Sequence, residues 1–136
     1  MIGLDTNVLI RWLVHDQLIG GLAEDQAEAL ESLFAHNVDG FFINEIVVVE
    51  IAWVLKQRAR LPKAQILDIL SIVLDLENAV VKDREVLLAA LKSYQNFAGD
   101  FSDHLIGEIN RRQGCSTTMT FDKAAAKSPH FTELRS

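Results

Sequence analysis

Four acidic side chains have the chemistry and the setting for a metal site: Asp5, Glu50, Asp103 and Asp122. Each lies in a stretch that is otherwise apolar, where a carboxylate is costly unless it is paired or bound to a metal ion. Hard cations such as Mg²⁺ and Mn²⁺ prefer oxygen ligands, and two of them about 4 Å apart can activate a water for attack on a phosphodiester. We therefore predict that the four carboxylates converge and hold one or two such ions.

Each of these acids also has an ordinary structural explanation. Asp5 and Asp122 precede helical sequence and can cap it. Glu50 can face solvent, although its apolar neighbours favour a position shielded from solvent. Asp103 follows Asp100 by three positions at the start of a helical pattern, where acids stabilise a helix by a few tenths to about 1 kcal/mol. Taken singly, the residues leave both explanations open.

The elements that position these acids alternate between strands and helices. Short apolar or β-rich runs predict strands over 1–4, 40–44, 78–82 and 115–120, and a short edge strand over 131–134. Apolar residues at helical spacing predict helices over 8–14, 23–36, 46–55, 62–74, 83–94 and 100–113, and a helical turn over 124–127. The opening strand is expected to be buried.

The segment 46–55 is ambiguous. Its three consecutive valines, 47–49, favour a strand because β-branched residues suit extended backbone, whereas its length favours a buried helix. We predict a helix that is capped by Asn44 and ends in the basic stretch 56–58.

Strands that alternate with helices indicate a three-layer α/β/α fold with a mostly parallel central sheet of four or five strands. The length of 136 residues, without a repeat or linker, predicts a single domain over 1–136. Acids placed where strands end and helices begin are typical of binding sites in α/β proteins.

Composition excludes several classes of protein. No apolar run reaches the roughly 18 residues of a membrane-spanning helix, and the first residues lack the positive charge of a secretory signal. A single cysteine, Cys115, excludes an intramolecular disulfide and a cysteine-based zinc site. We therefore expect a cytoplasmic protein with no membrane partner.

Charge is unevenly distributed along the chain. The net charge is −6, yet residues 1–55 hold nine acids and one base, whereas residues 56–136 hold ten acids and twelve bases. An acidic chain is a poor non-specific binder of nucleic acid, because phosphate contacts come from lysine and arginine. A nucleic-acid partner would therefore require a local basic strip or bound metal ions.

Four stretches resemble the PIN domain in sequence and in order, and within that family they are most similar to VapC-type toxins of toxin–antitoxin pairs. The stretches are 4–10 (Leu-Asp-Thr-Asn-Val-Leu-Ile), 43–51, 100–106 (Asp-Phe-Ser-Asp-His-Leu-Ile) and 120–123 (Thr-Phe-Asp-Lys). The resemblance covers essentially the whole chain. A lone Asp-Thr-Asn is weak, whereas the ordered set of four stretches is specific.

The resemblance implies a metal-dependent endoribonuclease. The acidic quartet of the family falls on Asp5, Glu50, Asp103 and Asp122, and a less regular extra acid falls on Asp100, which ranks below Asp103 as a ligand. Supporting roles fall on Thr6, Asn7 and Thr120. The residue His104 is not expected to be a ligand.

The resemblance also implies the reaction and the partners. A metal-activated water would attack a phosphodiester of single-stranded or loop RNA, without a nucleophilic side chain. The partners would be a second copy in a homodimer and a small antitoxin, whose basic segment would suit the acidic first half of this chain. Arg11, Lys56 and Arg58 are candidate RNA contacts, although cations at a helix end also complement the helix dipole.

Two other classes remain open on the sequence alone. One is a non-catalytic protein-binding module, either PIN-like or like a receiver domain, which also gathers acids and Mg²⁺ at strand ends. Against the receiver alternative, this chain has no paired acids after its first predicted strand and no evident aspartate at the end of a strand in mid-chain. The other is a DNA-directed nuclease of related fold, which differs only in its substrate.

Overall fold

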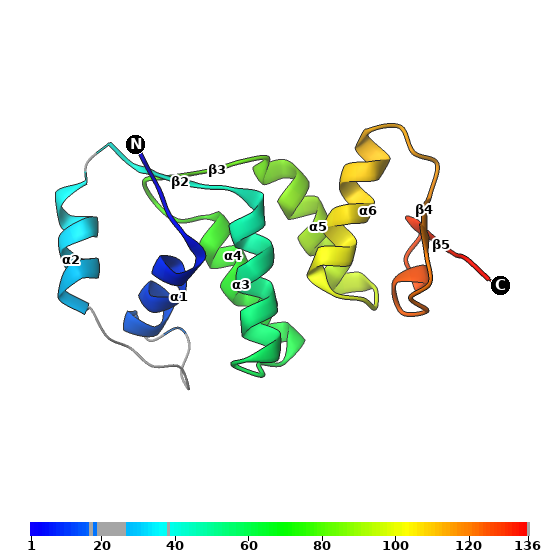
Figure 1. Ribbon diagram of the computed structural model, residues 1–136, viewed down its shortest axis with the longest axis horizontal. Helices are drawn as coiled ribbons and strands as arrows, with labels where there is room; N and C mark the ends of the chain where they lie inside the picture. The colour runs from blue at the N-terminus through cyan, green and yellow to red at the C-terminus, as the bar shows by residue number, and fades with distance from the viewer. Residues whose placement is uncertain (17, 19–26, 38, 136) are drawn as a thin grey trace. The chain divides into compact units, whose positions relative to one another are not determined.

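The computed structural model describes residues 1–16, 18, 27–37 and 39–135, and its strands and helices alternate along the chain (Figure 1). The chain divides into two compact units, Met1–Lys82 and Asp83–Ser136, and each is described by itself. The first unit contains β1 (Ile2–Gly3), α1 (Thr6–His15), α2 (Ala27–His36), β2 (Phe41–Ile43), α3 (Glu45–Gln57), α4 (Lys63–Leu74) and β3 (Ala79–Val81). The second contains α5 (Arg84–Asn96), α6 (Phe101–Arg112), β4 (Thr118–Thr120), the 3₁₀ turn η1 (Ala125–Lys127) and β5 (Phe131–Glu133).

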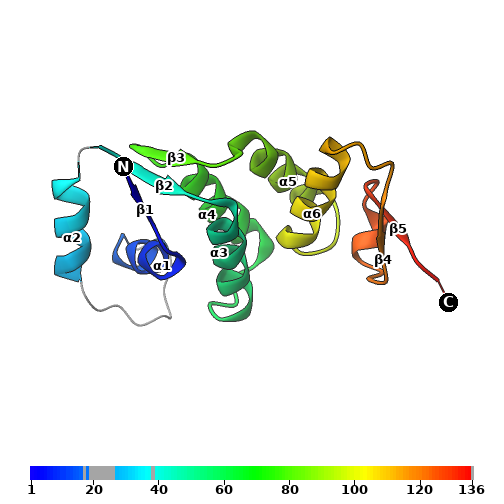
Figure 2. The same ribbon diagram turned by 45° about the horizontal axis from the view of Figure 1, so that its top comes forward.

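The first unit is built on a parallel three-stranded sheet in the order β1-β2-β3 (Figure 2). Ile2 pairs with Phe41, which in turn pairs with Ala79. Helices α1 and α2 connect β1 to β2, and α3 and α4 connect β2 to β3, as parallel pairing requires. The carboxyl ends of the strands therefore lie at one edge, where β1 leads into α1 and β2 into α3.

The ambiguous segment after β2 is helical, as predicted. The side chain of Asn44 accepts a hydrogen bond from the backbone N–H of Val47 at 3.0 Å and so caps α3. Val48 and Ile51 are fully buried, so the valine run supplies a packed helix face rather than a strand. Burial in the core outweighs the mild preference of β-branched residues for extended backbone.

The core of the first unit lies among α1, α3, α4 and the sheet. The apolar side chains at helical spacing on α4 are all buried and therefore belong to the core of this unit. They are Ile66, Ile69, Leu70, Val73 and Leu74. The fully buried large side chains of the unit are Leu9, Leu13, Ile43, Val48, Ile51, Leu55, Ile66, Leu70, Val73 and Leu74.

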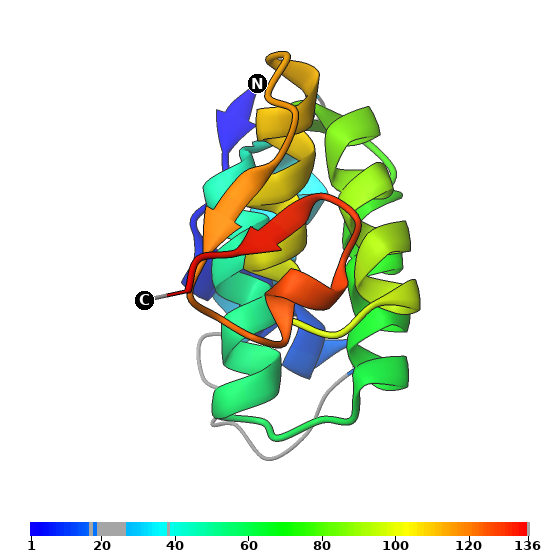
Figure 3. The same ribbon diagram turned by 90° about the vertical axis from the view of Figure 1, so that its right-hand side faces the viewer.

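The second unit pairs α5 with α6 and adds a two-stranded parallel sheet, β4-β5, whose strands are joined through η1 (Figure 3). The strands pair in the register Thr118 with Phe131 and Thr120 with Glu133. Helix α6 approaches β5 closely at Gly107, where a Cβ atom would lie 2.7 Å from the Phe131 ring. Glycine at this position therefore lets the helix and the strand pack together.

The α/β class with parallel strands is confirmed. The five predicted strands are all present, in one sheet of three strands and one of two. In β1, Ile2 and Gly3 are exposed whereas the next residue, Leu4, is buried. The prediction of a buried opening strand is therefore wrong for β1 itself, because it lies at the edge of its sheet.

Some predictions fall partly outside the described residues. The helix predicted over 23–36 is described from Ala27 onward, and its first residues lie outside the described part. The single-domain organisation stays a prediction. No helix in the described ranges is long and apolar enough to cross a membrane.

Candidate metal centre

Asp5 lies at the junction between β1 and α1. Its backbone is extended, and its Oδ1 accepts a hydrogen bond from the backbone N–H of Thr6 at 2.8 Å. Asp5 therefore caps α1, and its carboxylate is exposed at the end of the strand. The capping explanation and the ligand explanation are compatible, because a carboxylate has four lone-pair sites.

Glu50 is linked to this junction through a buried hydroxyl. Thr6 is 7% exposed, and its Oγ1 donates a hydrogen bond to Glu50 Oε1 at 2.7 Å. Thr6 thus ties the start of α1 to the middle of α3, because its backbone N–H donates to Asp5 and its hydroxyl donates to Glu50. The first unit brings these two acids into one neighbourhood.

The expectation that apolar neighbours shield Glu50 from solvent is wrong. Its neighbours on α3 point elsewhere: Val47, Val48 and Ile51 are buried, whereas Glu50 is exposed. Helical spacing places Glu50 on the same side as Ile46 and Trp53, which are 65% and 59% exposed. The carboxylate therefore lies on an exposed helix face with apolar residues one turn away in either direction.

The other candidates of the first unit lie on the same two helices. Asn7 is exposed in the first turn of α1, next to Thr6, and Arg11 is half-buried one turn farther along. Lys56 is exposed in the last turn of α3, and Arg58, also exposed, is its C-terminal cap. Contact of the three basic residues with RNA stays a prediction.

Asp100 and Asp103 in the second unit form a capping box at the start of α6. The backbone N–H of Asp100 donates to Asp103 Oδ2 at 2.9 Å, and Asp100 is the N-terminal cap residue. The predicted role of these acids at a helix start is confirmed. The box also fixes the direction of the half-buried Asp103 carboxylate.

Asp122 lies in the tight turn that follows β4. Its Oδ1 accepts from the backbone N–H of Ala124 at 2.9 Å, and its own N–H donates to Thr120 Oγ1 at 3.0 Å. The hydroxyl of Thr120 therefore supports the backbone of Asp122, whereas its supporting role in a metal site stays a prediction. The Asp122 carboxylate is exposed.

The donors described so far are carboxylate and hydroxyl oxygens, the set that suits a hard divalent cation. Within residues 1–16, 18, 27–37 and 39–135, no group of three or more histidine, cysteine, aspartate or glutamate side chains is arranged as a metal site. The predicted quartet takes two acids from each unit, and its convergence stays a prediction.

Glu108 is a charged residue that the sequence interpretation missed. It is 2% exposed, and its Oε1 accepts from Arg111 Nη2 at 2.6 Å and from Arg112 Nε at 2.9 Å. His130 Nε2 lies 3.5 Å from the other carboxylate oxygen. The hydrogen bond from Arg111, supported by Arg112, lowers the pKa of Glu108 although burial opposes this shift.

The signal for this cluster was present in the sequence. Arginines three and four positions after a glutamate on a helix are placed to pair with it. Because His130 precedes β5, the cluster connects the end of α6 to the entrance of the last strand. These contacts therefore join two segments that lie far apart in the sequence.

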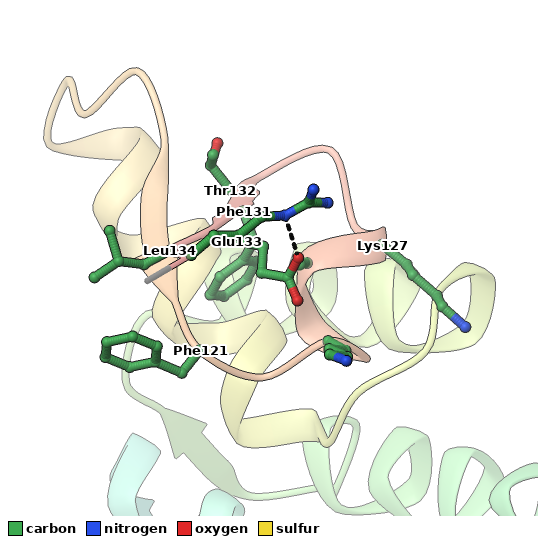
Figure 4. Close-up of a pocket in the computed structure, with 9 residues that line it drawn as sticks. Phe121, Lys127, Phe131, Thr132, Glu133 and Leu134 are labelled. Carbon is green, nitrogen blue, oxygen red and sulfur yellow. Dashed lines mark hydrogen bonds and ion pairs between the residues drawn. The ribbon is translucent and has the colours of Figure 1, made fainter.

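A shallow hollow of about 910 Å³ beside β5 was also missed (Figure 4). Phe121 and Leu134 lie at one side of it and Lys127 at the other, while Arg135 and Glu133 form an ion pair at 2.8 Å. Sequence patterns do not reveal the hollow, since it lies among the turn after β4, η1 and β5, and no local pattern encodes how these segments come together. Its lining residues are Phe121, Lys123, Ala126, Lys127, Phe131, Thr132, Glu133, Leu134 and Arg135.

Comparison with known proteins identifies the family. A model of the PIN domain matches residues 2–129, nearly the whole chain, whereas no curated protein matches it. PIN domains are generally nucleases that act on nucleic acids and typically use divalent metal ions. The four stretches that carry the sequence resemblance lie within the matched residues. The chain therefore belongs to the PIN domain family.

Proposed function

We propose that the chain is a metal-dependent endoribonuclease whose site is the quartet Asp5, Glu50, Asp103 and Asp122. The observation that carries the proposal is the Thr6 hydroxyl, which donates to Glu50 at 2.7 Å next to the Asp5 cap. A hydrogen bond from a buried hydroxyl to an exposed carboxylate restricts the positions of that carboxylate. Such restriction is what a metal ligand requires. The family match supports the same class of chemistry.

Mg²⁺ or Mn²⁺, as one or two ions, would supply Lewis acidity that activates water and neutralises charge on the phosphodiester. The chain's own residues would orient the ligands. Thr6 would hold Glu50, the capping box would direct Asp103, and Thr120 would brace the turn at Asp122. Asn7 would stand beside the first aspartate, and Asp100 is a further, weaker candidate ligand.

We propose that this nuclease is the toxin of a type II toxin–antitoxin pair in the cytoplasm, active as a homodimer. The acidic first 55 residues favour an antitoxin with a basic segment. The exposed residues Ile46 and Trp53, on either side of Glu50, suit a partner that covers the site. An arginine of that partner would be attracted by the carboxylates.

The test is cleavage of total RNA by the purified chain with Mg²⁺ or Mn²⁺, with and without EDTA. Asp5→Asn and Glu50→Gln should lower the rate by at least about 100-fold, because each removes one ligand charge while it keeps the shape. Glu28→Gln is the matched control, since Glu28 is an exposed helical acid outside the quartet. Unchanged rates in the quartet variants, together with indifference to EDTA, would refute the proposal.

Two additional substrates separate the alternatives. Preferential cleavage of single-stranded DNA would identify a DNA-directed nuclease, and labelling by acetyl phosphate without any cleavage would identify a receiver-like module. Metal binding is measured independently by thermal unfolding. Mn²⁺ should raise the Tm of the parent chain more than that of Asp5→Asn, because a ligand stabilises only the state that binds it.

A further inference from the structure

The hollow beside β5 combines an exposed aromatic ring with positive charge. Phe121 is 75% exposed, the most exposed large apolar side chain among the described residues. Of the residues that line the hollow, Lys123, Lys127 and Arg135 are basic, and Glu133 alone is acidic. Because Glu133 pairs with Arg135, two lysine charges remain to attract an anion.

This combination differs from the rest of the chain, which is acidic as a whole. An exposed aromatic ring loses no protein packing when it accepts a ligand, and its face can stack on any nucleobase. Lysines beside such a ring neutralise the phosphates that follow the base. The chemistry that fits is therefore a flexible polyanion with planar rings, which describes an unpaired strand of nucleic acid.

The position of the hollow is as informative as its composition. Phe121 and Lys123 flank Asp122 in the chain, and the turn that holds Asp122 is fixed by its bonds to Thr120 and Ala124. A base that stacks on Phe121 would therefore lie beside the turn that holds Asp122, although Asp122 itself does not line the hollow. A duplex cannot offer its bases in this way, since they are stacked on one another.

We propose that this hollow is a subsite for single-stranded RNA, in which Phe121 stacks on the base of the nucleotide beside the scissile bond while Lys123 and Lys127 contact its phosphates. The proposal rests on the proposed ribonuclease activity for the identity of the substrate. It adds a residue-level account of why an unpaired strand is selected.

The test is the affinity of the purified chain, in EDTA, for a short fluorescent oligoribonucleotide of mixed sequence, measured by anisotropy. Phe121→Ala should weaken binding about tenfold, and Phe121→Trp should retain it because the larger ring also stacks. Met119→Ala is the matched control, since Met119 is 51% exposed on β4, two residues before Phe121, but does not line the hollow. Lys123→Gln and Lys127→Gln should each reduce the salt dependence of log K by about 0.7.

The same strand annealed to its complement should bind more weakly and should not respond to Phe121→Ala. Equal affinity of Phe121→Ala and the parent chain for the single strand would overturn the proposal. This is also the result expected if the hollow binds a protein segment instead of RNA. Because binding is measured without metal, its outcome is independent of cleavage. If Phe121→Ala loses RNA binding but the parent chain shows no nuclease activity, the subsite is supported and the proposed function is refuted. If the parent chain cleaves RNA and Phe121→Ala cleaves it equally well, the proposed function is supported and the subsite is refuted.

Discussion

The hydroxyl of Thr6 donates a 2.7 Å hydrogen bond to the carboxylate of Glu50, a residue 44 positions away on another helix. The bond joins a buried donor to an exposed acceptor, so the well-packed Thr6 side chain holds the exposed Glu50 carboxylate in place. It couples the start of α1, where Asp5 is the cap, to the middle of α3. Changes at Thr6 should therefore affect both stability and the acidic site.

Thr6→Val keeps the volume of the side chain and removes the donor. We expect the free energy of unfolding to fall by about 1 kcal/mol, since the lost bond is to a charged but exposed group. The affinity for Mn²⁺ should also fall, because Glu50 is no longer held. Urea unfolding and titration calorimetry measure the two effects. Thr6→Ser, which keeps the hydroxyl, should stay close to the parent chain, and equal Mn²⁺ affinity in the valine and serine variants would contradict the role given to Thr6.

Asparagine substitutions distinguish the proposed roles of Asp100 and Asp103, the two acids at the start of α6. Asparagine is as good a cap as aspartate at position 100, and at position 103 its side-chain oxygen can still accept the hydrogen bond of the capping box. The free energies of unfolding of Asp100→Asn and Asp103→Asn should therefore both lie within about 1 kcal/mol of that of the parent chain. Cleavage of RNA should fall much further in Asp103→Asn than in Asp100→Asn, because Asp103 is the stronger candidate ligand. Rates that fall equally would place both acids in the metal site, and rates that fall most for Asp100 would reverse their roles.

Glu108 should make stability depend on pH. Its pKa in the folded chain is lowered chiefly by the hydrogen bond from Arg111, below the ordinary value of 4.5. A lowered pKa means that the ionised carboxylate stabilises the folded state above pH 4.5, and that this contribution disappears as the pH falls through the folded pKa. Glu108→Gln should lower the free energy of unfolding at neutral pH by about 1–2 kcal/mol, since both arginines remain partly solvated.

The measurement is urea unfolding between neutral and acidic pH. The difference between the parent chain and Glu108→Gln should shrink as the pH falls, because the parent glutamate becomes protonated. Glu85→Gln is the control, since Glu85 is exposed in the first turn of α5. A difference that stays constant across this range would show that the ion cluster is not the source of the stabilisation.

Gly107→Ala tests the close packing of α6 on β5. A Cβ atom there would lie 2.7 Å from the Phe131 ring, so the helix and the strand would have to separate. We expect a loss of about 1–3 kcal/mol in the free energy of unfolding, despite the higher helix propensity of alanine. Gly3→Ala is the matched control because nothing lies within 4 Å of the corresponding Cβ position. Equal stability of the two variants would show that Phe131 moves aside freely.

Local chemistry made the elements of the fold predictable. Asn44 caps α3 as its residue type suggests, and the apolar stripe of α4 is buried at the expected spacing. The capping box of Asp100 and Asp103 follows from acids three positions apart at a helix start. These features depend on neighbours within one or two turns, which the sequence displays directly.

Features that depend on distant partners were harder to predict. The exposure of Glu50 follows from which side of α3 meets α1 and α4, and helical periodicity is weak when nearly every neighbour is apolar. The hollow beside Phe121 is lined by the turn after β4, by η1 and by β5 with the residues after it, and no local pattern encodes how these segments come together. The acidic quartet was inferred from order and resemblance, and it remains a prediction that the experiments above address.

The last strand has a consequence for how the chain tolerates shortening. The backbone N–H of Leu134 donates to the carbonyl oxygen of Thr120 at 2.7 Å, and Thr120 in turn supports the turn at Asp122. The residues that match the PIN domain model end at 129, before this strand begins. A stop codon in place of Phe131 would therefore leave all four acids of the proposed quartet in the chain and still remove the strand that holds Thr120 and, through it, the turn at Asp122.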